Sequence, residues 1–363
     1  MKVTIIGAGN TGLAMAAHLS KDGHQVTLWN RSREPIETLM KSRTIHSEGI
    51  IEGSFVIDKV TDDMAEALEN TDIIMITTPA FSHKSLARLI GKHLKNEPII
   101  ILNPGRTCGA IEFQTIFSRY NRKCQPTIAE TQTAIYTSRK TYDDSVMIYS
   151  IKKNVLLSTF DSNQNQSIID QLPETFKPHL MPAQSLVETS IGNVGMILHT
   201  APLLLNTGWT ENPNHEYLYY HDGITPTISN FIEKLDNERI NVGKRLGSKI
   251  ESTKEWMKRV YNIKGRTLYE CIQNNKAYQK ITAPNTLHHR YIYEDIACGL
   301  VPLEFIGKSV GLKMAYTGLV IDLASAILDE NFRRTGRNLQ YFQNRVNIKT
   351  FFQVGEFHEA RTS

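Results

Sequence analysis

The first half of the chain alternates short apolar runs with stretches whose apolar residues recur at helical spacing. The runs at 72–78 and 98–104 are apolar almost throughout, which is typical of parallel strands covered on both faces. Strands that alternate with helices in this way predict a doubly wound α/β sheet of Rossmann type. Later runs at 146–152 and 154–160 are expected to extend the same sheet.

The second half has a different pattern. From about Val187 onward the apolar residues keep helical spacing, as in 226–250 and 305–332, and no convincing strand occurs. The change lies near Gln184, so we expect a nucleotide-binding domain at 1–184 and an all-α domain at 185–363. Two domains also agree with a length of 363 residues, since about 150 residues per domain is usual.

Composition argues against several classes of protein. A net charge of +4 is small for this length and does not indicate a nucleic-acid partner. No apolar stretch approaches the roughly 20 residues that a membrane helix requires, and the N-terminus lacks the apolar segment of a signal peptide. The four cysteines have no Cys-x-x-Cys spacing, which predicts thiols in a reducing compartment and no metal site. We therefore expect a cytoplasmic protein that has no membrane partner.

A glycine-rich turn follows the first predicted strand and opens the first predicted helix. Gly7, Gly9 and Gly12 have G-x-G-x-x-G spacing in this context, which is typical of dinucleotide binding. Gly7 permits the tight turn, Gly9 lets a pyrophosphate approach the backbone, and Gly12 allows the helix to pack closely on the sheet. Backbone N–H groups at the start of the helix, around Asn10 and Thr11, would hold the phosphates. A glycine turn that binds no ligand is the alternative.

The end of the second strand bears on the choice of cofactor. An NAD site commonly has an acidic residue there, whereas this chain has Asn30, Arg31 and Ser32. With Arg33, which follows Ser32, two guanidiniums and a hydroxyl suit a 2′-phosphate, so NADP is favoured and NAD stays open. The end of the fourth strand should also pass beside the cofactor, which makes Thr78 and Pro79 candidates for contact with it.

Two further segments each allow two interpretations. The turn at 103–106 ends the next strand on the same edge of the sheet, where a plain β-turn is an equal alternative to a ligand contact. The segment 212–223 supplies aromatic rings that would line a subsite for an amine, or it forms an exposed loop between helices.

His199 stands in an apolar stretch, 187–206, that is expected to form one helix. A single histidine on an apolar helix is more often structural than catalytic, so its partners decide its role. The segment 285–303 offers such partners, because it contains both Arg290 and Asp295. An aspartate fixes the tautomer of a histidine, and an arginine binds a carboxylate through two parallel hydrogen bonds.

Three motifs together resemble the octopine/nopaline, or opine, dehydrogenase family: the N-terminal GAGNTG, the central ILHTAPLLLNTGW and the C-terminal HRYIYEDIACGLVPL. The resemblance implies a Rossmann domain followed by a helical domain similar to that of 6-phosphogluconate dehydrogenase. It also implies the reductive condensation of an amino acid with a 2-keto acid such as pyruvate, with NADH or NADPH as reductant. Carried over by motif, the catalytic histidine is His199, its aspartate partner is Asp295, and the arginine that binds the keto-acid carboxylate is Arg290. Gln132 of AETQT and Asn206 of LLLNTGW are further expected substrate contacts.

Other functions remain open from the sequence. A reductase of 2-keto or 3-hydroxy acids commonly uses a lysine on the substrate helix, and 187–209 contains none. A non-catalytic protein that senses NADP would bind the cofactor without oxidising it. One departure from the family pattern, Ala297–Cys298 in place of a bulkier pair, leaves the amine donor undetermined. The expected partners are the two small substrates, and the apolar helical domain is compatible with a homodimer.

Overall fold

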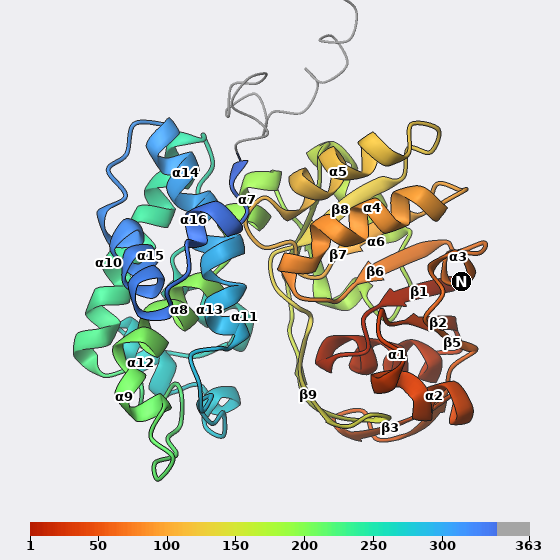
Figure 1. Cartoon of the computed structure of the whole chain (residues 1–363), viewed down its shortest axis with the longest axis horizontal. Coiled ribbons are helices and arrows are strands. Elements are labelled where there is room, and N and C mark those ends of the chain that lie inside the picture. Colours follow the sequence, from red (N-terminus) through yellow and green to blue (C-terminus); the bar gives the residue numbers. More distant parts are fainter. Residues whose placement is uncertain (340–363) are drawn as a thin grey trace, which may run out of the picture. The chain divides into compact units, whose positions relative to one another are not determined.

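In the computed structural model, which describes residues 1–339, the chain divides into two compact units (Figure 1). The first unit comprises residues 1–105 and 109–184, and the second comprises residues 106–108 and the described residues from 185 onward. The division expected at Gln184 differs from this in residues 106–108, which belong to the second unit. Residues 340–363 of the expected all-α domain lie outside the described part of the chain.

An eight-stranded sheet forms the centre of the first unit, with the strand order β12-β11-β8-β7-β6-β1-β2-β5. The strands from β8 to β5 pair in parallel, whereas β11 runs antiparallel to β8. The parallel part has the order of a dinucleotide-binding Rossmann fold, which confirms the predicted fold class. The strands of this sheet are β1 (Lys2–Ile6), β2 (Gln25–Trp29), β5 (Lys59–Thr61), β6 (Ile73–Ile76), β7 (Ile99–Leu102), β8 (Thr127–Thr131), β11 (Val155–Thr159) and β12 (Leu180–Pro182).

Helices of the first unit follow the strands as the sequence pattern predicts. The helix after the glycine turn ends just before Gly23, whose positive φ of 78° suits a helix terminus. Helices α4 and α5 pack on each other (Figure 1). The helices are α1 (Asn10–Lys21), α2 (Glu37–Ser42), α3 (Met64–Ala67), α4 (His83–His93), α5 (Gly109–Tyr120) and α6 (Asn165–Asp170).

A second sheet, of order β4-β3-β10-β9, packs against α1. The run at 146–152 forms β10 of this sheet, so the prediction that it extends the main sheet is wrong, whereas the run at 154–160 does extend the main sheet as β11. β10 buries Val146 and Ile148 and leaves Met147 and Tyr149 more exposed, which is typical of a sheet with one solvated face. The strands are β3 (Thr44–Gly49), β4 (Gly53–Val56), β9 (Tyr136–Tyr142) and β10 (Ser145–Ile151).

Helices form the second unit, and apart from a single bridge between Leu218 and Thr282 its described residues contain no β-structure. The all-α class predicted for this part is therefore confirmed. The one helix expected over 187–206 is instead two, since the chain leaves the helix after Ile191 and starts again at Gly195. The helices are α7 (Leu186–Ile191), α8 (Gly195–Leu205), α9 (Thr207–Thr210), α10 (Pro226–Arg245), α11 (Thr253–Tyr261), α12 (Leu268–Gln273), α13 (Arg290–Tyr293), α14 (Val301–Ser309), α15 (Ala315–Leu328) and α16 (Phe332–Thr335).

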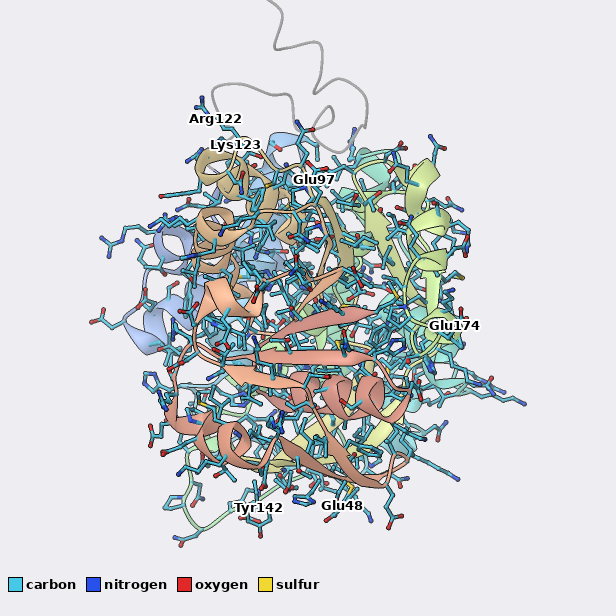
Figure 2. All side chains as sticks on the ribbon, turned by 90° about the vertical axis from the view of Figure 1, so that its right-hand side faces the viewer. Glu48, Glu97, Arg122, Lys123, Tyr142 and Glu174 are labelled. Carbon is cyan, nitrogen blue, oxygen red and sulfur yellow. The ribbon has the colours of Figure 1, made fainter. Side chains whose placement is uncertain are left out.

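Polar and aromatic side chains project from the surface of the first unit. Figure 2 shows Tyr142 and Glu48, on β9 and β3, pointing outward from the second sheet. No helix among residues 1–339 combines the length and the apolar character that crossing a lipid bilayer requires. All four cysteines are thiols.

Candidate active site

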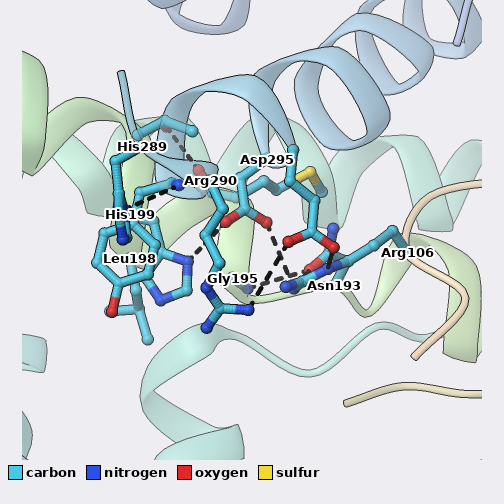
Figure 3. Close-up of polar contacts among 12 residues, drawn as sticks. Arg106, Asn193, Gly195, Leu198, His199, His289, Arg290 and Asp295 are labelled. Atoms are coloured by element: carbon cyan, nitrogen blue, oxygen red, sulfur yellow. Dashed lines mark hydrogen bonds and ion pairs between the residues drawn. The ribbon is translucent and has the colours of Figure 1, made fainter. Parts of the chain in front are cut away.

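A histidine–aspartate pair lies inside the second unit (Figure 3). His199 lies on α8, and Asp295 lies between α13 and a π-helix, Ile296–Leu300. Nδ1 of the imidazole is 2.7 Å from Oδ2 of Asp295, and the two side chains are 13% and 1% exposed. The structure thus brings together two residues that are 96 positions apart in the sequence.

The second ring nitrogen of His199 faces the hydroxyl of Tyr220, at 3.1 Å from Nε2. Burial, together with the charges of Arg106 and Arg290, lowers the pKa of His199 although Asp295 acts to raise it, which favours the neutral imidazole. Because Nδ1 donates its hydrogen to Asp295, Nε2 carries the lone pair and accepts from Tyr220. Burial also raises the pKa of Tyr220 well above its ordinary value, so this phenol keeps its proton.

Aromatic rings enclose the imidazole. The ring of Tyr291 stacks on His199 with 3.9 Å between the ring centroids. The hydroxyl of Tyr219 donates to the carbonyl oxygen of His199 at 2.6 Å. Tyr219 and Tyr220 come from the segment 212–223, so part of that segment is buried beside the histidine and is not an exposed loop.

Arg106 holds the other oxygen of the aspartate, with Nη1 3.3 Å from Oδ1 of Asp295. Burial alone would raise the pKa of Asp295, but the charges of Arg106 and His199 outweigh burial and lower it. No sequence motif singles out Arg106, because its other carboxylate partner, Glu294, is 188 positions away. The one local signal was an arginine directly after a turn that ends a strand.

The predicted substrate contacts come from different elements of the two units. Arg290 opens α13 with its side chain 50% exposed, and its Nη1 is 3.8 Å from Oε2 of Glu294. Asn206 follows α8 and donates from Nδ2 to two backbone carbonyl oxygens, each at 2.8 Å. Gln132 is buried in the first unit, directly after β8.

The glycine turn of the first unit has the shape that a dinucleotide needs. A Cβ at Gly12 would overlap the carbonyl oxygen of Gly7, so this glycine lets the helix approach the strand. A Cβ at Gly9 would meet nothing within 4 Å, which leaves open space where a phosphate fits. Thr77 closes the turn, because its Oγ1 donates to the carbonyl oxygens of Ile6 and Gly7.

Residues at the end of β2 face solvent. Asn30 accepts from the backbone N–H of Ala8 at 3.3 Å and donates from Nδ2 to the carbonyl oxygen of Ser32 at 2.8 Å. Arg31 and Ser32 are exposed. Asn30 therefore ties the strand end to the glycine turn, and the exposed Arg31 follows it directly in the chain.

The remaining predicted cofactor residues lie around the same edge of the first unit. Thr78 and Pro79 lie in the loop after β6, and Thr78 accepts a hydrogen bond from Ser82. Asn10 and Thr11 form the first turn of α1. The amide oxygen of Asn10 accepts from the backbone N–H of Lys140 at 2.8 Å, which connects the turn to β9.

Comparisons with known proteins identify relatives of both units. Residues 182–328 match the alpha-helical domain of NAD/NADP octopine/nopaline dehydrogenase, and residues 2–107 match the N-terminus of NAD-dependent glycerol-3-phosphate dehydrogenase. An opine dehydrogenase of Arthrobacter sp. (strain 1C) is 34% identical over 337 residues, which cover 93% of each chain. A structure of octopine dehydrogenase in complex with NADH and agmatine has a TM-score of 0.75 at 16% identity, and covers 93% of both chains. The NADP+-bound yersinopine dehydrogenase has a TM-score of 0.75 at 15% identity, also over 93% of both chains.

Proposed function

The chain belongs to the opine dehydrogenase family, and from this premise we propose that it condenses the amino group of an amino acid with a 2-keto acid, pyruvate in particular, at the expense of NAD(P)H. The observation that carries the proposal is the hydrogen bond of 2.7 Å between His199 and Asp295 in the helical unit. An imidazole with a fixed tautomer is the acid–base group that amine addition and the loss of water require.

We place the cofactor at the glycine turn after β1. The open space at Gly9 and the close packing at Gly12 fit a pyrophosphate against the start of α1. The exposed Arg31 and Ser32 at the end of β2, in place of an acidic residue, support NADPH over NADH. When bound, the nicotinamide supplies the hydride that reduces the imine formed from the two substrates.

His199 accepts the proton of the substrate ammonium at Nε2, and Asp295 stabilises the imidazolium that forms. The same Nε2–H then donates its proton to the oxygen that leaves as water. Arg290, whose guanidinium is half exposed, binds the carboxylate of the keto acid through parallel hydrogen bonds.

Two further residues complete the proposed substrate contacts. Gln132 is the proposed contact of the keto acid from the first unit. The amide oxygen of Asn206 is its proposed contact with a substrate, because Nδ2 already donates to two backbone carbonyl oxygens. The cytoplasm is the proposed compartment, which four cysteines present as thiols support.

The test is a screen of NADPH and NADH oxidation by the purified protein. We expect oxidation only when pyruvate and an amino acid are both present, with a lower KM for NADPH than for NADH. Oxidation with a keto acid alone would indicate a simple keto-acid reductase. Binding of NADPH without oxidation by any pair of substrates would indicate a sensor.

His199→Ala tests the residue that carries the mechanism. We expect kcat to fall by about 10²–10⁴-fold, since a positioned acid–base group contributes that much. The Kd for NADPH, measured by fluorescence titration, should not change because His199 lies in the helical unit. His93→Ala, at the end of α4, is the matched control. Near-normal turnover of His199→Ala would refute the assignment.

A further inference from the structure

Arg106 lies in a buried cluster with Asn193, Glu294 and Asp295, the Arg106 cluster (Figure 3). Its Nε is 3.2 Å from Oε1 of Glu294, and its Nη1 is 3.2 Å from Oδ1 of Asn193 and 3.3 Å from Oδ1 of Asp295. The side chains of Arg106, Glu294 and Asp295 are 9%, 3% and 1% exposed. Charges buried to this extent are tolerated only when they are paired and hydrogen-bonded.

The backbone around Arg106 is fixed to the second unit. The N–H of Thr107 donates to the carbonyl oxygen of Cys298 at 3.2 Å, and Arg337 donates to the carbonyl oxygen of Thr107 at 2.6 Å. The N–H of Cys108 donates to Ser190 at 2.7 Å. Arg106 itself has a φ of 60°, in the left-handed region that non-glycine residues seldom adopt. The fold therefore holds this backbone in an unfavourable conformation and sets the position of the guanidinium.

Two cations face the two carboxylates of the cluster. Arg106 lies between Glu294 and Asp295, and Arg290, whose side chain is half exposed, is 3.8 Å from Oε2 of Glu294. Without the guanidinium, two adjacent buried carboxylates would repel each other, and uptake of a proton by the imidazole of His199 would relieve this repulsion.

Asp295 divides its oxygens, with Oδ2 on His199 and Oδ1 toward Arg106. We propose, resting on the function proposed above, that Arg106 is a positioning residue of the acid–base pair. It holds Oδ1 of Asp295, so that Oδ2 is turned toward His199, and its positive charge opposes protonation of the imidazole, without touching the substrate.

Gly195, the first residue of α8, makes room for this arrangement. A Cβ at this position would collide with Nη1 of Arg106 and lie 3.1 Å from Oδ1 of Asp295. Moving the guanidinium away would lengthen its contacts with Asn193 and Asp295, so a side chain here would disturb the cluster.

Other titratable groups face the pair from every element that packs on it. Among them, Arg106 and Arg290 carry a permanent positive charge, and solvent screens Arg290 because its side chain is half exposed. Arg106 is therefore the cation with the larger effect on His199. The facing groups are His289, Arg290, Tyr291 and Glu294 on or beside α13, Cys298 of the π-helix, and Tyr219 and Tyr220 of the segment 212–223.

The test measures the pKa of the His199 imidazole by NMR of the full-length protein without substrates, with the resonance assigned by comparison with His199→Gln. Arg106→Gln should raise this pKa by about one unit, because a nearby cation is lost. Glu294→Gln should lower it, because an anion is lost. The double variant R106Q/E294Q should return it toward the wild-type value, and Arg106→Lys should leave it close to that value.

Kinetics provide the second readout. The acid limb of the kcat/KM pH profile should shift to higher pH in Arg106→Gln and to lower pH in Glu294→Gln. We expect kcat to fall at least tenfold in Arg106→Gln. Arg106→Lys should recover part of this lost kcat. An unmoved His199 pKa in Arg106→Gln, with only a lower melting temperature, would overturn the proposal. If Arg106→Gln does not fold, an unmoved pKa in Glu294→Gln would overturn it equally. The NMR titration needs no turnover. If the predicted pKa shifts occur but the protein makes no opine, the proposed function is refuted and the positioning role of Arg106 stands.

Discussion

At the scale of single residues, the hydroxyl of Tyr220 lies 3.1 Å from Nε2 of His199, the position that the proposed function assigns to a substrate amine. Burial raises the pKa of Tyr220, so the hydroxyl donates its hydrogen and stabilises the neutral imidazole. A buried Nε2 without a partner would cost free energy, and the tyrosine removes that cost when no substrate is bound. An ammonium can displace it, because a charge-assisted hydrogen bond is stronger than a neutral one.

Tyr220→Phe should therefore raise the pKa of His199, because the donor to its neutral form is lost. A net hydrogen-bond contribution of about 1 kcal/mol corresponds to about 0.7 unit, which should appear as a shift of the acid limb of kcat/KM to higher pH. Tyr278→Phe is the matched control, since the Tyr278 ring stacks on Tyr220 at 3.9 Å. Loss of kcat by more than about 100-fold in Tyr220→Phe would contradict a capping role and indicate that this hydroxyl itself moves the proton.

At the scale of helices and strands, the extent of burial decides which elements a sequence pattern can predict. β6 and β7 are buried almost throughout, and their continuous apolar runs were sufficient to predict them. β10 is half buried and pairs with β3, about 100 positions earlier, and periodicity carries no information on that choice of partner. The break between α7 and α8 depends on the side chain of Asn193, whose Oδ1 accepts from the N–H of Gly195.

The same distinction applies to the candidate site. Local motifs single out His199 and Asp295, because each stands in a distinctive stretch of sequence. Arg106 and Tyr220 acquire their roles only from contacts across the fold, with Arg106 bound to a carboxylate 188 positions away. Such contacts leave no periodic or spacing signal in a single chain.

The turn between β1 and α1 allows a prediction at this scale, because its glycines meet different surroundings. Gly12→Ala should lower the free energy of unfolding by about 1–3 kcal/mol, since the methyl group would overlap the carbonyl oxygen of Gly7. Gly9→Ala should leave the stability nearly unchanged and weaken NADPH binding, because its methyl group would enter the open space assigned to a phosphate. Denaturant unfolding and a fluorescence titration with NADPH measure the two effects. Equal losses of stability in both variants would contradict this division of roles.

At the scale of the whole molecule, burial lowers the pKa of histidines in both units. In each case burial is the largest cause, because it disfavours the charged imidazolium. The unfolded chain exposes the same side chains, whose pKa is then about 6.5. For His289 the folded value is about 4. The histidines concerned are His18, His24 and His179 in the first unit and His199 and His289 in the second.

At a pH between the folded and the unfolded pKa of these histidines, the unfolded chain binds more protons than the folded chain. The free energy of unfolding must therefore rise with pH in that interval. The full contribution is present above pH 7 and is lost as the pH falls through about 6.5 toward the folded values. Calorimetry at pH 7.5, 6.5 and 5.5 should therefore show Tm falling by several degrees, in the transitions of both units. Carboxylates with a lowered pKa, such as Asp295, act only below about pH 4.5, so this range reports the histidines. His289→Asn, which keeps a side chain able to cap α13, should reduce the loss of Tm between pH 6.5 and 5.5. A constant Tm across the range would mean that protonation of the buried imidazoles does not lower the stability of the folded protein. That result would also contradict a neutral resting state of His199.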